Sequence, residues 1–251
     1  MVQQSVFLFD PDNLRSLADD YRSRFAQASP FPHVVIDNFM PAWAAERVLE
    51  AFPGVDDPCW LDWTKRDIEH QPKKQGIGNA GRLRGVDPFI QSVLAAFNGH
   101  EFIRFLESLT GLKGLVPDPH FYGGGLHQIL PGGHLDIHAD FNLLAETKLY
   151  RRTNVILYLN ENWRDDYRGS LELWRQGGER AEVEIAPVFN RLVAFQTDLK
   201  SLHGHPTPLA CPEGMTRRSI AIYHYSVDPW PGQEQGEKVN WQTHGGRRDP
   251  A

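Results

Sequence analysis

Hydrophobic residues in the first 110 positions recur at helical spacing. A first helix is predicted from Asp10, a capping residue that precedes a proline, to about Gln27, because apolar residues repeat every three or four positions between them. The same spacing predicts helices that begin at Pro41 and at Asp87, and it continues to a natural helix stop at Gly111. The N-terminal part is therefore expected to be mainly helical.

The periodicity fails between residues 55 and 85. This segment carries aromatic and basic residues among several glycines, namely Trp60, Trp63, Lys65, Arg82 and Arg84. A long irregular connection inside a compact domain is either functional or mobile. Two interpretations stay open: a lid or substrate loop whose side chains line the opening of a site, or a solvated loop with aromatic residues packed on the surface.

After residue 115 the pattern changes to short runs of β-branched and aromatic residues separated by glycine and proline. The predicted strands cover residues 126–130, 134–140, 154–160, 170–174, 182–185, 191–196, 202–203 and 217–225, and a further β-like run lies at 33–36. Roughly eight short strands at this spacing indicate a double sheet or a barrel. Helices followed by strands predict an α+β fold, with the helices packed on one outer face of the sheets.

Length and composition add limits to this picture. The chain has 251 residues, and we expect a single domain with helical support and a substrate loop over 1–115, a strand-built core over 116–230 and a loosely held tail over 231–251. A net charge of −6 gives no reason to expect nucleic acid or an anionic membrane as a partner. Two widely separated cysteines and no apolar run long enough to cross a bilayer predict a cytoplasmic protein.

Candidate chemistry lies in one predicted strand. His134, Asp136, His138 and Asp140 occupy alternate positions and share one face, because side chains of a strand alternate between faces. Four metal-type ligands on one face are typical of the wall of a metal pocket. Two histidines and one carboxylate on one side of an ion leave its other side open, as in non-heme Fe(II) oxygenases.

A third ligand must come from a later strand. His203 and His205 form the main later histidine cluster, and we favour His203, although a capped surface turn would also explain a lone His-Gly pair.

A candidate carboxylate pocket follows in the last predicted strand. Arg217 and Ser219 share one face, so the planar fork of the arginine and the hydroxyl of the serine can bind one carboxylate. A register shift of one residue would place Arg218 inward instead. Tyr158, which alone is typical of a packed core tyrosine, is positioned to add its hydroxyl to the same pocket.

An ordered series of motifs resembles the Fe(II)/2-oxoglutarate-dependent dioxygenases of the prolyl-hydroxylase-like branch. The series spans about residues 120–226 and comprises Gly133-x-Leu135-x-x-His138-x-Asp140, Tyr158–Trp163, Leu171–Leu173, Asn190–Phe195, His203 and Arg217-x-Ser219. One departure is Gly169-Ser170, where the family usually has two glycines. A less specific likeness covers residues 31–37.

This resemblance implies a double-stranded β-helix, or jelly roll, that holds Fe(II) by His138, Asp140 and His203. It also implies that 2-oxoglutarate chelates the metal while its far carboxylate meets Arg217, helped by Tyr158 and Ser219. The pair His134 and Asp136 fits the chemistry but not the family position.

The implied reaction consumes O2 and 2-oxoglutarate, releases succinate and CO2, and hydroxylates a C–H bond. The expected substrate is a prolyl residue, a free amino acid or a related small metabolite, and retention of Asp140 favours hydroxylation over halogenation. Two alternatives remain open: a cupin-like metal enzyme without oxidative chemistry, and a non-catalytic relative that binds a partner at the mouth of the barrel.

Overall fold

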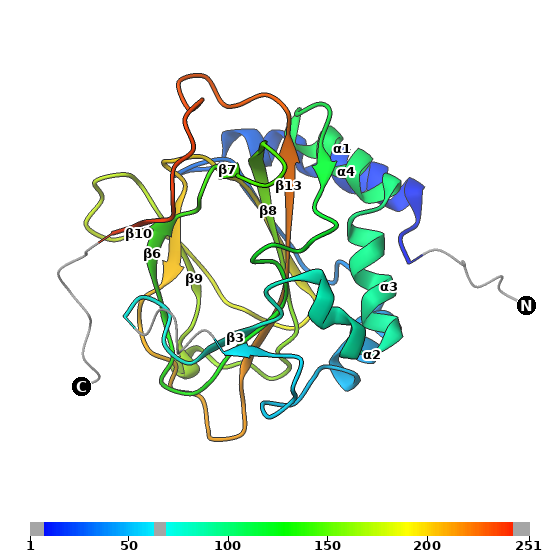
Figure 1. Ribbon diagram of the computed structural model, residues 1–251, viewed down its shortest axis with the longest axis vertical. Coiled ribbons are helices and arrows are strands. Elements are labelled where there is room, and N and C mark those ends of the chain that lie inside the picture. Colours follow the sequence, from blue (N-terminus) through cyan, green and yellow to red (C-terminus); the bar gives the residue numbers. More distant parts are fainter. Residues whose placement is uncertain (1–7, 63–68, 243–251) are drawn as a thin grey trace, which may run out of the picture.

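Two antiparallel sheets face each other, and helices cover the outer face of the larger one (Figure 1). The computed structural model describes residues 8–62 and 69–242. The helices are α1 (Pro11–Gln27), α2 (Ala42–Glu50), α3 (Pro88–Phe97) and α4 (His100–Thr110), with short 3-10 helices η2 (Ala80–Gly85) and η3 (Asp165–Tyr167). The prediction of an α+β jelly-roll fold with N-terminal helices is confirmed.

The larger sheet runs in the order β1-β11-β8-β13-β5-β3-β2, with β4 beside β13 and β7 beside β8. Its strands are β1 (His33–Ile36), β2 (Leu61–Asp62), β3 (Lys74–Gly76), β4 (Val116–Pro117), β5 (Gly125–Ile129), β7 (Leu143–Leu144), β8 (Leu149–Tyr158), β11 (Arg191–Gln196) and β13 (Arg217–Ser226). The smaller sheet runs β10-β9-β12-β6-β14. Its strands are β6 (Leu135–Ala139), β9 (Leu171–Trp174), β10 (Ala181–Ile185), β12 (Leu202–His205) and β14 (Asn240–Trp241).

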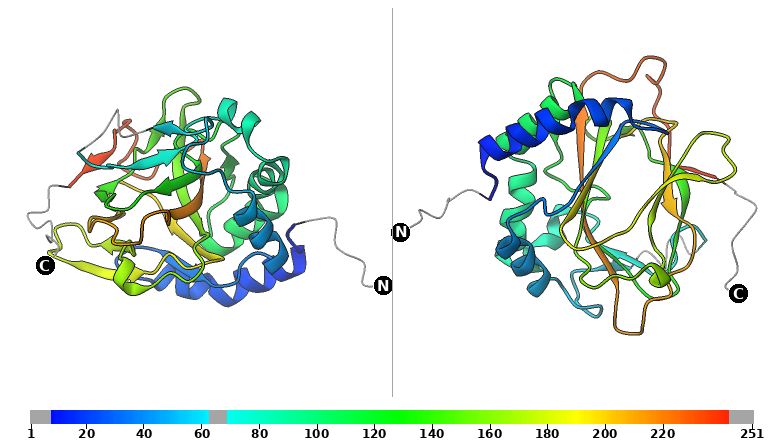
Figure 2. Two further views of the ribbon diagram at one scale, coloured as in Figure 1. Left: turned by 90° about the horizontal axis from the view of Figure 1, so that it is seen from below. Right: turned by 180° about the vertical axis from the view of Figure 1, so that it is seen from behind.

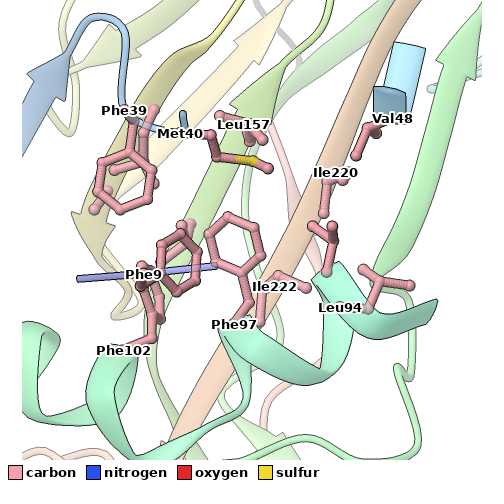
Figure 3. Packing of buried hydrophobic residues seen from close by; sticks show 14 of the residues in the cluster. Phe9, Phe39, Met40, Val48, Leu94, Phe97, Phe102, Leu157, Ile220 and Ile222 are labelled. Carbon is pink, nitrogen blue, oxygen red and sulfur yellow. The ribbon is translucent and has the colours of Figure 1, made fainter. Parts of the chain in front are cut away.

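Side chains along β13 alternate between two faces, one packed against the helices and one turned toward the candidate site. Ile220 and Ile222 point outward into the main hydrophobic core, where they meet aromatic residues of the helical layer such as Phe97 and Phe102 (Figure 3). Ser219 and Ala221, which alternate with them along the strand, line the space between the sheets. The helices therefore support the strands that carry the site without entering it (Figure 2).

The helix boundaries follow local chemistry. The Asp10 side chain accepts a hydrogen bond from the backbone N–H of Asn13, at 2.9 Å, and thereby caps α1. Gly111 ends α4 in a left-handed conformation with φ of 77°, which glycine adopts without steric cost. Both ends agree with the sequence-based prediction.

Two predictions about irregular segments are wrong. The connection between residues 55 and 85 contains β2, β3 and η2, and β3 extends the large sheet by pairing with β5. The tail is not loosely held throughout, because Asn240 and Trp241 pair with β6. These elements are too short to show a hydrophobic period in the sequence. Pairing with strands far away in the chain stabilises them instead.

Pairing between β12 and β6 brings two backbones into close approach at Gly204. A Cβ atom there would lie 2.7 Å from the carbonyl oxygens of both Leu135 and Asp136, well inside contact distance. Only glycine lets β12 lie this close to β6 at that point.

We expect Gly204→Ala to lower the free energy of unfolding by about 1–3 kcal/mol, because the added methyl group overpacks a backbone contact. Chemical denaturation followed by tryptophan fluorescence measures the change. Gly85→Ala is the matched control, since a Cβ there meets nothing within 4 Å. Equal stability of the two variants would contradict this account of the strand contact.

Candidate active site

Three potential metal ligands converge between the sheets. His138 lies on β6, Asp140 directly follows that strand, and His203 lies on β12. One ligand atom from each residue lies within 4.8 Å of the others. The ladder between β12 and β6 pairs His203 with His138, so the convergence follows from strand register. These distances suit ligation of one ion by all three residues.

Backbone hydrogen bonds orient both imidazoles toward this point. Nδ1 of His138 lies 2.8 Å from the carbonyl oxygen of Asp136, and Nδ1 of His203 lies 2.9 Å from that of Ser201. Because a carbonyl only accepts, each Nδ1 donates and each Nε2 keeps its lone pair for a metal. The Nε2 atoms lie 3.7 and 3.8 Å from the Asp140 carboxylate oxygens.

Burial keeps the second histidine in its neutral, metal-binding form. Burial, followed by the neighbouring His138, lowers the pKa of His203 to about 4. The donor set of two neutral imidazoles and a carboxylate fits Fe(II) bound from one side.

Arg151 supports the carboxylate ligand. Its Nη1 forms an ion pair with Oδ2 of Asp140 at 2.8 Å, and its guanidinium lies between the rings of Phe141 and Tyr223, 3.9 and 3.8 Å from their centroids. Burial alone raises the pKa of Asp140, but Arg151 and the two histidines outweigh burial and hold that pKa well below its usual range. The ligand is therefore anionic before any metal binds.

A bulge explains why the sequence pattern missed Arg151. Counting back along β8 by twos from Tyr158 through Asn154 predicts that Arg152 faces inward. The register between β8 and β13 shifts at this end, since Thr153 pairs with His224 whereas Arg151 pairs with Tyr225. The extra residue turns Arg151 toward the site.

A second group of polar residues lies deeper between the sheets. Arg217, only 6% exposed, donates from Nε to the carbonyl of Gly169 at 2.7 Å and from Nη2 to the hydroxyl of Tyr158 at 3.1 Å. Ser219 pairs with Tyr158 across the ladder between β13 and β8. The register therefore places Arg217, rather than Arg218, on the inward face.

These residues line a cavity of about 90 Å³, termed the inner cavity, which reaches the metal ligands. Its polar lining includes Tyr158, His203, His205, Arg217 and Ser219. Burial raises the pKa of Tyr158 against the opposing charge of Arg217, so the hydroxyl keeps its proton. Among the described residues no carboxylate forms an ion pair with Arg217, and a buried guanidinium without an anion is costly. A dicarboxylate that reaches from the metal would supply that anion.

A larger cavity of about 490 Å³, termed the outer cavity, adjoins the inner one, and Lys74, His138 and Asp140 line both. Lys74 and Arg82 line it from the segment that contains β3 and η2, and Trp241 of β14 lines it from the C-terminal side. The indole of Trp241 lies against the His138 ring, with centroids 4.8 Å apart. No local pattern indicated Trp241, because only its pairing with β6 brings it to the site.

The predicted substrate residues separate into different places. Arg82 lines the outer cavity, while Arg84 is exposed and is not part of that lining. Trp60 was wrongly predicted as a substrate residue: it is buried in the main core against Phe52, and its indole N–H donates to the carbonyl of Gly54. Trp63 and Lys65 lie outside the described residues.

The alternative pair of predicted ligands, His134 just before β6 and Asp136 on it, makes other contacts. Asp136 interacts with two histidines, at 3.3 Å from Nε2 of His134 and 3.1 Å from Nδ1 of His70. Within the described residues, the cluster able to hold a metal comprises His138, Asp140 and His203.

We expect Arg151→Met to weaken binding of a divalent metal about 10- to 100-fold, as loss of a group that orients a ligand does. Methionine fills the space between Phe141 and Tyr223 but leaves Asp140 without its cation. Calorimetric titration of the metal-free protein with Fe(II) under argon measures the affinity. Arg180→Met, at an exposed position, is the control, and unchanged Fe(II) affinity in Arg151→Met would contradict the proposed support.

Comparison with known proteins agrees with this geometry. Residues 124–225 match the model of the 2OG-Fe(II) oxygenase superfamily, a range that contains the metal ligands and the carboxylate pocket. No curated protein sequence matches the chain significantly.

Solved structures share the fold at low identity. A prolyl 4-hydroxylase from Phytophthora capsici is 19% identical over 90% of this chain and 68% of its own, with a TM-score of 0.56. A prolyl-4-hydroxylase from Pseudomonas putida is 18% identical over 84% of this chain and 99% of its own, with a TM-score of 0.50. HygX from Streptomyces hygroscopicus, solved with nickel, 2-oxoglutarate and hygromycin B, is 12% identical over 83% and 87%, with a TM-score of 0.51.

None of the helices in the described part of the chain is long and apolar enough to cross a bilayer. The matched core, its His-Asp-His cluster and the shared fold support an oxygenase that uses Fe(II) as its metal and 2-oxoglutarate and O2 as co-substrates. The chain therefore carries a 2OG-Fe(II) oxygenase core over residues 124–225 and shares its fold with prolyl 4-hydroxylases of known structure.

Proposed function

We propose that this oxygenase hydroxylates a C–H bond of a small substrate that carries an anionic group, with an amino acid or a related carboxylic acid as the favoured class. Succinate and CO2 are the co-products. The single observation that carries the proposal is that ligands of one metal cluster line both an inner cavity that contains Arg217 and an outer cavity that contains Arg82.

The inner side of the cluster suits the co-substrate. His138, Asp140 and His203 would hold Fe(II) from one side, and Arg217 with Tyr158 would receive the far carboxylate of 2-oxoglutarate. Bound iron, together with 2-oxoglutarate and O2, supplies the oxidising power for hydroxylation. The apolar side chains of Ile156 and Leu171, which also line the inner cavity, reduce the access of water to it.

The outer side suits an anion. Lys74, Arg82 and Arg151 bring three cationic side chains to the lining, whereas Asp140 is the one carboxylate among the described lining residues. Arg151 already pairs with Asp140, whereas Arg82 contacts backbone carbonyls and forms no ion pair among the described residues. An anionic group bound there would place the rest of the substrate beside the metal.

Backbone contacts hold Arg82 in position. Its Nη1 donates to the carbonyl oxygens of Cys59 and Trp60, at 3.3 and 2.9 Å. Trp60 is fixed in the core, so this anchor is rigid. A pre-positioned guanidinium binds a carboxylate with less loss of side-chain entropy.

We expect His138→Ala and Asp140→Asn each to lower 2-oxoglutarate-dependent succinate release by more than about 100-fold, beyond the cost of losing a group that only orients a ligand. Succinate formed under air with Fe(II) is measured by mass spectrometry. Glu179→Gln, at an exposed turn, is the control. Full succinate release by both ligand variants would refute the proposed centre.

The charge of the substrate has its own test. Among free amino acids and small carboxylic acids, each paired with its amide, only acids are expected to stimulate succinate release. Arg82→Gln is expected to raise the KM of a stimulating acid about tenfold, the effect of one lost charge-assisted hydrogen bond.

Arg84→Gln is the matched control, because Arg84 lies on the same 3-10 helix but outside the outer cavity. Amides that stimulate as strongly as the acids would contradict the anionic class. If the anionic class is contradicted, succinate release without added substrate is still informative. An equal rate of this release in Arg82→Gln and native protein shows that the oxygenase assignment holds.

A further inference from the structure

His205 is a buried polar side chain that the metal centre does not use. It lies on β12 two residues after His203 and is 1% exposed. Neither of its ring nitrogens has a hydrogen-bond partner among the described residues. Its ring lines the inner cavity together with Arg217 and Tyr158.

Packing alone does not account for a histidine at this position. A valine or leucine would fill the same space without leaving two polar atoms unsatisfied away from water. The alternation of β12 turns His205 to the same side as His203, so its ring faces the cavity rather than the outer surface of the sheet. A ligand within the cavity is the partner that the geometry leaves for it.

The carboxylate pocket has room for another donor. Arg217 already uses Nε on the carbonyl of Gly169 and one N–H of Nη2 on Tyr158. A carboxylate has about four acceptor positions, more than the three remaining N–H groups of Arg217 fill, so other donors that line the inner cavity, such as Tyr158 and His205, can share the rest. An imidazole N–H beside the guanidinium adds a donor that carries no charge to repel it.

We infer that His205 is a positioning residue for the co-substrate, whose ring N–H donates a hydrogen bond to the far carboxylate of 2-oxoglutarate beside Arg217. The other ring nitrogen then accepts from a water molecule. This inference rests on the proposed co-substrate site at Arg217 and adds a residue to it.

Binding of 2-oxoglutarate to the Fe(II)-loaded protein under argon, measured by calorimetry, tests the inference without turnover. His205→Val is expected to weaken binding about tenfold, the effect of one lost hydrogen bond to a charged group. His205→Gln, which keeps an N–H donor, is expected to stay within about threefold of the native affinity. Fe(II) affinity is expected to be unchanged in both.

A second ligand separates a specific contact from a general disturbance. The monocarboxylate 2-oxopentanoate lacks the far carboxylate, so native protein and His205→Val are expected to bind it equally. In turnover, His205→Val is expected to raise the KM for 2-oxoglutarate with little change in kcat. His100→Gln, at the exposed start of α4, is the surface control.

Three outcomes overturn the inference. The first is native 2-oxoglutarate affinity in His205→Val, and the second is an equal loss of affinity for both ligands in that variant. The third is a loss of 2-oxoglutarate affinity in His205→Gln when thermal denaturation shows that this variant is folded. Arg217→Met distinguishes this from failure of the site itself. If Arg217→Met binds 2-oxoglutarate as tightly as native protein, the proposed co-substrate site is wrong. If only His205→Val is unaffected, the site stands and His205 has no part in it.

Discussion

The antiparallel pairing of β12 with β6 is the contact on which the site depends. It sets His203 opposite His138, so that two imidazoles from residues 65 positions apart meet at one point. Gly204 permits the close approach of the backbones, and carbonyl groups of the same strand regions orient both rings. A shift of one residue in this register would turn His203 to the opposite face of the sheet.

Charge compensation organises the rest of the site around that pairing. Arg151 balances Asp140 inside the protein, whereas Arg217 has no carboxylate among the described residues. A buried cation without a counter-ion favours a ligand that brings one. The two cavities thus differ in the cation that each presents to a ligand: Arg217 lines the inner cavity, and Arg82 lines the outer one.

The helical layer keeps these groups in place without taking part in the chemistry. The same strands expose aliphatic residues to the helices and polar residues to the site, so packing on one face fixes geometry on the other. The core in Figure 3 joins α3 and α4 to β8 and β13 through residues such as Phe97, Leu157 and Ile222. Ligands carried on strands packed in this way hold their positions better than ligands on loops.

The sequence by itself determined the helices, the main strands and the positions of His138, Asp140, His203, Arg217 and Tyr158 on inward faces, because local periods of 3.6 and 2 specify these features. Only the tertiary structure decided the roles of Arg151, Trp60 and Trp241. A bulge reverses the face of Arg151, core packing takes Trp60 away from the site, and pairing of a two-residue strand brings Trp241 to it. Each depends on contacts between residues far apart in the chain, which no local pattern records.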